Sequence, residues 1–98
     1  MENRIVKNEK RLDSILNSIN DLEISLEQFK ANFNNIKLLN KYYGSKNWFK
    51  DKDDYENNLI PKVKAGVLSE DAIWNMNEEI KELITEMKSI TFLFENNK

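Results

Sequence analysis

The 98-residue sequence has no cysteine and no histidine, and only two glycines and one proline. The chain therefore forms no disulfide, offers no thiol nucleophile or imidazole base, and lacks the usual zinc ligand sets. So few glycines and prolines permit long, uninterrupted helices. No run of 18 or more apolar residues is present, so no transmembrane helix is predicted. The first residues contain no apolar segment typical of a signal peptide, and we expect a cytoplasmic protein.

The composition is that of one small domain, which we expect to cover residues 1–98. Hydrophobic residues make up 40% of the chain and charged residues 33%, which is too apolar for simple disorder and too polar for a membrane protein. The formal net charge is −2, whereas nucleic-acid-binding domains usually carry a strongly basic patch. We therefore expect no direct binding to nucleic acid and no association with a membrane.

A heptad pattern of apolar residues dominates the first half of the chain. The steps between successive members alternate between three and four residues, which is typical of helices that pair in a coiled-coil-like manner. The members are Leu12, Ile15, Ile19, Leu22, Leu26, Phe29, Phe33 and Ile36. The pattern predicts one helix over about residues 2–43, ended by Gly44, since glycine adopts the left-handed conformation without strain.

A second stripe with the same period occupies the end of the chain. Its members are Ile73, Met76, Ile80, Leu83, Met87, Ile90 and Phe94. Ser69 precedes the stripe as a suitable N-cap, and Glu70 and Asp71 follow it where the helix dipole favours acidic residues. This stripe predicts a helix over about residues 70–95.

The connection between the stripes is predicted to hold a short third helix over about residues 46–56, capped by Ser45. Two stripes of matched period favour an all-α fold, a long antiparallel helical hairpin of coiled-coil-like character. The first predicted helix is about 20 Å longer than the last. Either the connection folds back over the excess or a second chain covers it, and we expect a homodimer.

The clusters of charged residues give little support for metal binding or acid–base catalysis. The acidic segment over residues 51–56 resembles the start of an EF-hand loop, but Glu56 stands at its sixth position and Lys62 at its twelfth, where calcium loops need Gly and Glu. Pairs such as Glu78 and Glu82 fit an exposed helix surface better than acid–base catalysis. The basic residues near the N-terminus are interleaved with acidic ones. We therefore expect no catalytic residues, no metal and no cofactor.

Five of the ten aromatic residues lie between positions 42 and 55. Tryptophan and tyrosine are favoured at protein interfaces, so these residues and one further tryptophan form the candidate partner-binding set. The set is Tyr42, Tyr43, Trp48, Phe49, Tyr55 and Trp74. The alternative is that they form a small core where the connection folds onto the helix ends.

The most specific run in the sequence extends from Gly66 to Ile73, Gly-Val-Leu-Ser-Glu-Asp-Ala-Ile. Together with the segments 42–45 and 59–61, and with Trp48 and Asp51, it resembles the short bacterial proteins grouped as domain-of-unknown-function family 4298. Members of this family tend to have Gly before the Leu-Pro, where this chain has Asn57-Asn58-Leu59, and Tyr is commoner at the position of Trp74. The resemblance implies a small bacterial protein and no particular activity.

Two functional hypotheses remain. The first is a non-enzymatic helical adaptor or accessory protein that binds a protein partner. The second is a small inhibitor or immunity protein that blocks an enzyme or toxin. Residues 69–98 hold seven acidic residues and three lysines, a net charge of −4, whereas the first 44 residues carry a net charge of +1. This asymmetry favours pairing of the last helix with the first. An outward acidic face also suits mimicry of nucleic acid or docking to a basic protein.

Overall fold

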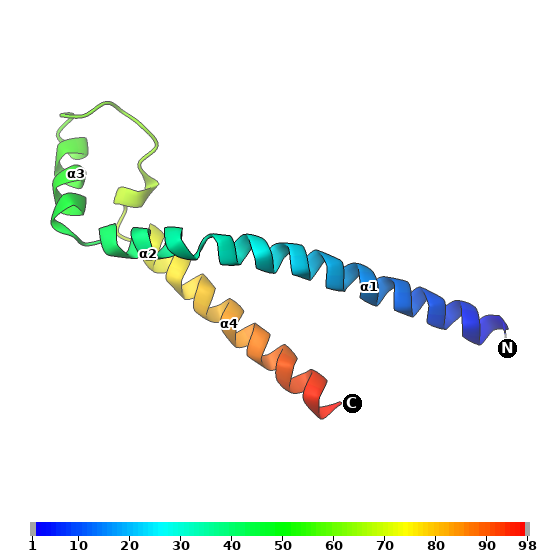
Figure 1. Cartoon of the computed structure of the whole chain (residues 1–98). Coiled ribbons are helices and arrows are strands. Elements are labelled where there is room, and N and C mark those ends of the chain that lie inside the picture. Colours follow the sequence, from blue (N-terminus) through cyan, green and yellow to red (C-terminus); the bar gives the residue numbers. More distant parts are fainter. Residues whose placement is uncertain (1, 98) are drawn as a thin grey trace. The chain divides into compact units, whose positions relative to one another are not determined.

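The computed structural model describes residues 2–97, with side chains from residue 3 onward. Its helices are α1 (Glu2–Ala31), α2 (Phe33–Tyr42), α3 (Lys46–Glu56), the short 3-10 helix η1 (Gly66–Leu68) and α4 (Ala72–Asn96) (Figure 1). Residues 2–97 contain no strand, so the predicted all-α class, with a short third helix in the connection, is confirmed. The chain divides into two compact units, one up to Lys37 and one from Leu38 onward.

Asn32 separates α1 from α2, at a point where the sequence predicts one helix over about residues 2–43. The backbone N–H of Asn32 donates to the Phe29 carbonyl at 3.0 Å. Its side-chain amide donates to the Gln28 carbonyl at 3.2 Å, which is the acceptor that the backbone would use in a regular α-helix. Asparagine competes with helical backbone bonds in this way, so the irregular turn has a local cause.

Gly44 ends α2, as the sequence predicts. Its φ of 76° lies in the left-handed region, which side chains with a Cβ atom rarely adopt. On either side of it, the Tyr43 N–H donates to the Leu39 carbonyl at 2.9 Å and the Ser45 N–H to the Tyr42 carbonyl at 3.0 Å. The turn at Gly44 therefore ends α2 and leads directly into α3.

The predicted bounds of the short helix agree with those of α3. Ser45 caps it by accepting a hydrogen bond from the Trp48 N–H at 3.2 Å. At its other end, the Asn58 N–H donates to the Tyr55 carbonyl and the Leu59 N–H to the Asp54 carbonyl, which is the Schellman arrangement. Asn58 has a φ of 57°, which lies in the left-handed region. It directly precedes Leu59, at the point where members of the family that the sequence resembles tend to have glycine.

From Asn58 the chain runs back in irregular conformation to η1 and the start of α4 (Figure 1). Ser69 accepts a hydrogen bond from the Ala72 N–H at 3.1 Å, at the first residue of α4. The N-cap position itself is Asp71, whose side chain forms no cap bond, so the helix begins about two residues later than predicted. The Asn40 and Asn77 side-chain amides bond to each other in both directions, at 2.7 and 3.3 Å. This amide pair joins the last turns of α2 to the first turns of α4.

Only two side chains among the described residues belong to a buried core. Trp48 is 4% exposed and Ile73 is 2% exposed. They come from α3 and from the first turn of α4, so the core lies in the unit that begins at Leu38. Within the described part of the chain, no helix combines the length and apolarity needed to span a membrane.

The two glycines predict opposite outcomes when alanine replaces them. Gly44→Ala forces a Cβ atom into the left-handed region and should lower the free energy of unfolding by about 1–2 kcal/mol. Gly66 has no such φ, and a Cβ atom there meets nothing within 4 Å. Gly66→Ala should therefore be neutral or stabilise by up to about 1 kcal/mol. Urea denaturation followed by circular dichroism measures both, and equal losses would contradict the role given to Gly44.

Candidate functional site

Trp48 is the centre of the aromatic cluster. Its indole Nε1–H donates to the Val67 carbonyl in η1 at 2.8 Å. The Tyr43 and Phe49 rings meet it edge-to-face, with centroids 5.3 and 4.9 Å away. The Tyr43 hydroxyl in turn donates to the Glu70 carbonyl. Two aromatic side chains thus hold the backbone of residues 67–70 through its carbonyl groups.

Lys52 adds a charged contact to the same cluster. Its Nζ lies 5.2 Å from the centroid of the Trp48 ring and 3.1 Å from Oε1 of Glu70. The Lys52 side chain is 24% exposed, whereas that of Glu70 is 77% exposed, so the ion pair itself stabilises little. The main effect of Lys52 is to cover the face of the indole ring.

Tyr42 and Asp51 form a second contact between α2 and α3. The tyrosine hydroxyl donates to Oδ2 of Asp51 at 2.6 Å. This hydrogen bond, with desolvation and the carboxylate charge as smaller causes, raises the pKa of Tyr42 to about 12. The neutral phenol is therefore the form that the folded protein favours.

Tyr55 organises the segment between α3 and η1. Its hydroxyl donates to the Val63 carbonyl at 3.2 Å. Lys62 places its Nζ 4.1 Å from the Tyr55 ring centroid and donates to the Tyr55 carbonyl at 3.0 Å. These contacts give the irregular segment a defined path without a hydrophobic core of its own.

The six candidate partner-binding residues thus fall into two groups. Tyr42, Tyr43, Trp48 and Tyr55 form hydrogen bonds inside the unit that begins at Leu38. Phe49 and Trp74 are both 57% exposed and remain available to a partner. Lys52 is not among the six candidates, although its position one helical turn after Trp48 is a signal by which the sequence could have identified it.

The acidic segment 51–56, which is predicted not to bind calcium, lies on α3. Asp51 accepts from Tyr42, and Asp54 pairs with Lys50 at 2.7 Å. The hydrogen bond to Asp54 is the main cause that raises the pKa of Lys50. Among the described residues, no three acidic side chains are grouped so that they could hold a metal ion. Asp51 and Asp54 therefore serve as partners for a hydroxyl and an ammonium group.

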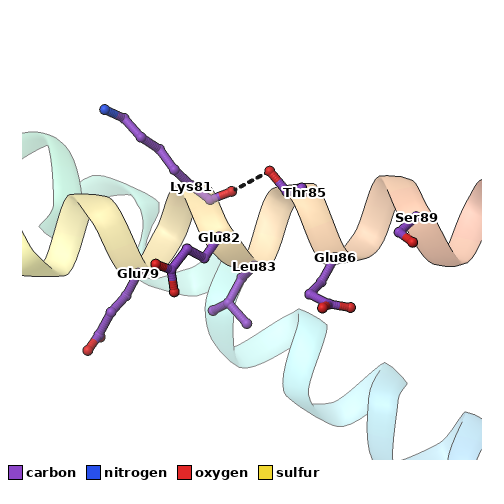
Figure 2. Close-up of a pocket in the computed structure, with 7 residues that line it drawn as sticks. All are labelled: Glu79, Lys81, Glu82, Leu83, Thr85, Glu86 and Ser89. Atoms are coloured by element: carbon purple, nitrogen blue, oxygen red, sulfur yellow. Dashed lines mark hydrogen bonds between the residues drawn. The ribbon is translucent and has the colours of Figure 1, made fainter.

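An open hollow runs along one side of α4. Its lining residues are Glu79, Lys81, Glu82, Leu83, Thr85, Glu86 and Ser89. Figure 2 shows Glu79, Leu83 and Glu86 pointing to the same side of the helix, whereas the Thr85 hydroxyl donates to the Lys81 carbonyl on another side. Because these lining residues all come from one helix, the surface suits an extended partner better than an enclosed small molecule.

The apolar stripes of α1 and α4 are the other prominent surface. In α1 the stripe members from Ile5 to Leu26 are 38–57% exposed. In α4 the members Leu83, Ile90 and Phe94 are 54%, 60% and 67% exposed. Helical stripes of this kind are seams for pairing with another apolar surface. The heptad pattern of the sequence identifies these residues as members of the two predicted helices.

The fold and its surfaces define a small all-α protein whose exposed features are helical stripes. A family model described as a domain of unknown function (DUF4298) matches residues 5–90, so the chain belongs to this family. The resemblance found in the sequence is thereby confirmed. No curated protein and no solved structure matches the chain significantly.

The two tryptophans predict a sharp difference in stability. Trp48→Phe removes the hydrogen bond to the Val67 carbonyl and leaves a gap beside Tyr43, so the free energy of unfolding should fall by about 1–3 kcal/mol. Trp74→Phe changes an exposed ring and should stay within about 0.5 kcal/mol of the parent chain. Chemical denaturation of both variants measures the difference. A Trp74 loss equal to the Trp48 loss would contradict the assignment of Trp48 as core.

The raised pKa of Tyr42 predicts a pH dependence at the alkaline end. The hydroxyl is protonated in the folded state up to about pH 12, whereas its ordinary pKa is 10.0. The stability that the Tyr42–Asp51 bond contributes is fully present below pH 10 and is lost as the pH rises toward 12. Tyrosinate absorbance should show one late ionisation in the parent chain. Asp51→Asn should move that step toward lower pH, and an unchanged titration would refute the assignment.

Proposed function

We propose that the chain is a non-enzymatic bacterial adaptor or accessory protein that binds a protein partner through its exposed helical stripes. The observation that carries the proposal is the exposure of regularly spaced, large apolar residues on helices that otherwise present charged side chains. Contiguous apolar surface of this kind marks interaction sites in water-exposed proteins. The bacterial setting comes from the family resemblance, and a cytoplasmic location is part of the same proposal.

The second half of α4 is the surface best suited to a partner. Leu83, Met87, Ile90 and Phe94 follow one another in steps of four, three and four residues, so they lie along one face. Burying a large apolar side chain fully stabilises by about 1.5–3 kcal/mol, and these side chains are about half-exposed. A partner that covers them therefore gains enough to offset part of the cost of association.

Charge defines the chemistry of that partner. Glu79, Glu82 and Glu86 lie beside Leu83 along the hollow on α4. Acidic side chains that flank an apolar stripe favour a partner whose own apolar surface is bordered by lysine or arginine, because opposite charges steer association and suppress wrong pairings. The proposed partner is a protein with an apolar helix or groove and a basic rim.

Two matched variants of α4 test the proposal. Ile90→Asp places a carboxylate in the apolar stripe, while Thr91→Asp adds the same charge at the neighbouring position, outside both the stripe and the hollow. Affinity purification from the source bacterium, with the full chain as bait, should capture a protein with the parent chain and with Thr91→Asp. Ile90→Asp should weaken that binding about tenfold or more.

The helical circular dichroism of both variants should match that of the parent chain, because both positions are exposed. A captured protein that binds Ile90→Asp as tightly as the parent chain would remove α4 as the docking surface. Failure of the parent chain to bind any protein would overturn the proposed function.

A further inference from the structure

The charges along α1 are divided between its two halves. Residues 2–11 hold four basic residues and two acidic residues, a net charge of +2. Residues 12–31 hold four acidic residues and one basic residue, Lys30, a net charge of −3. The basic residues of the first half are Arg4, Lys7, Lys10 and Arg11, and the acidic residues of the second half are Asp13, Asp21, Glu23 and Glu27. Lys30 pairs with Glu27 at 3.4 Å, and the helix has a net basic end and a net acidic end.

The apolar stripe crosses both halves without interruption by charge. Its exposed members in α1 are Ile5, Leu12, Ile15, Ile19, Leu22 and Leu26. The heptad position between Ile5 and Leu12 is occupied by Asn8. Its amide donates to the Arg4 carbonyl at 2.9 Å and accepts from Arg11 at 2.9 Å. Because Asn8 is satisfied within its own helix, it can lie in an apolar seam at low cost.

We propose that α1 pairs antiparallel with α1 of a second copy of this chain. In that orientation the basic end of each helix lies against the acidic end of the other, and twofold symmetry forms this favourable contact twice. A parallel pair would instead place the two basic ends together. The inference rests on the proposed function, since it names one partner of the interaction protein, but it uses α1 and leaves the stripe of α4 free.

The heptad spacing indicates the register of the pair. When Ile15 faces Ile19 of the second copy, Leu12 faces its Leu22 and Ile5 faces its Phe29, so these layers are apolar on both sides. In the same register Asn8 faces Leu26, so that layer pairs an amide with an apolar side chain. An open hollow lined by Arg4, Ile5, Asn8 and Glu9 lies where that phenylalanine would insert. The N-terminal end of α1 thus offers a hollow into which a large side chain can insert.

Oligomeric state tests the pairing with two matched variants of the full chain. Ile15→Asp places two carboxylates in neighbouring layers at the centre of the seam, whereas Ser14→Asp adds the same charge on the outer side of α1. Sedimentation and light scattering should show a dimer for the parent chain and for Ser14→Asp. Ile15→Asp should raise the dimer dissociation constant by about 100-fold. A parent chain that stays monomeric at all concentrations would overturn the proposal.

Cysteine crosslinking tests the orientation, because the chain has no cysteine of its own. Ile5→Cys and Phe29→Cys lie about 36 Å apart along one helix. In the antiparallel pair, neither variant should form a disulfide with itself, and a mixture of the two should form the mixed disulfide. A disulfide between two Ile5→Cys chains would overturn the antiparallel orientation.

The two proposals can fail separately. If Ile15→Asp is monomeric and still captures the protein that the parent chain captures, the dimer is supported and the α4 surface acts independently of it. If the parent chain is a dimer but captures no other protein, the proposed function fails and the antiparallel pair stands.

Discussion

The hydrogen bond from the Trp48 indole to the Val67 carbonyl is the contact on which the connection between α2 and α4 depends. It ties α3 to η1 across 19 positions of sequence, with the Tyr43–Glu70 bond beside it. Each buried donor needs an acceptor, and each irregular backbone carbonyl needs a donor. One contact satisfies both needs, so the small core around Trp48 and Ile73 does not require many apolar side chains.

Two left-handed residues make that contact geometrically accessible. Gly44 turns the chain from α2 into α3, and Asn58 turns it out of α3 toward η1. Without these turns the helices would continue, and Trp48 could not reach the backbone of η1. Side chains of α2 and α3 thus bind the backbone of the run from Gly66 to Ile73, which favours a structural role for this run.

The connection and the long helices differ in the kind of contact that their side chains make. The connection gathers the polar and aromatic contacts, while α1 and the second half of α4 expose regularly spaced apolar residues. Surfaces lined by single helices suit pairing with other helices, whereas enclosed pockets suit small molecules. The proposed self-association through α1 and the proposed partner binding through α4 are compatible, because they use different helices.

The sequence by itself determined the helices and most of their ends, because apolar periodicity, caps and glycine act over a few neighbouring residues. It did not reveal the break at Asn32, since asparagine tolerates a helix until its side chain takes a backbone acceptor. Nor could it separate Trp48, which is buried, from Trp74, which is exposed. Only the tertiary structure decided that, because burial depends on which distant backbone group, here the Val67 carbonyl, comes within reach of the ring.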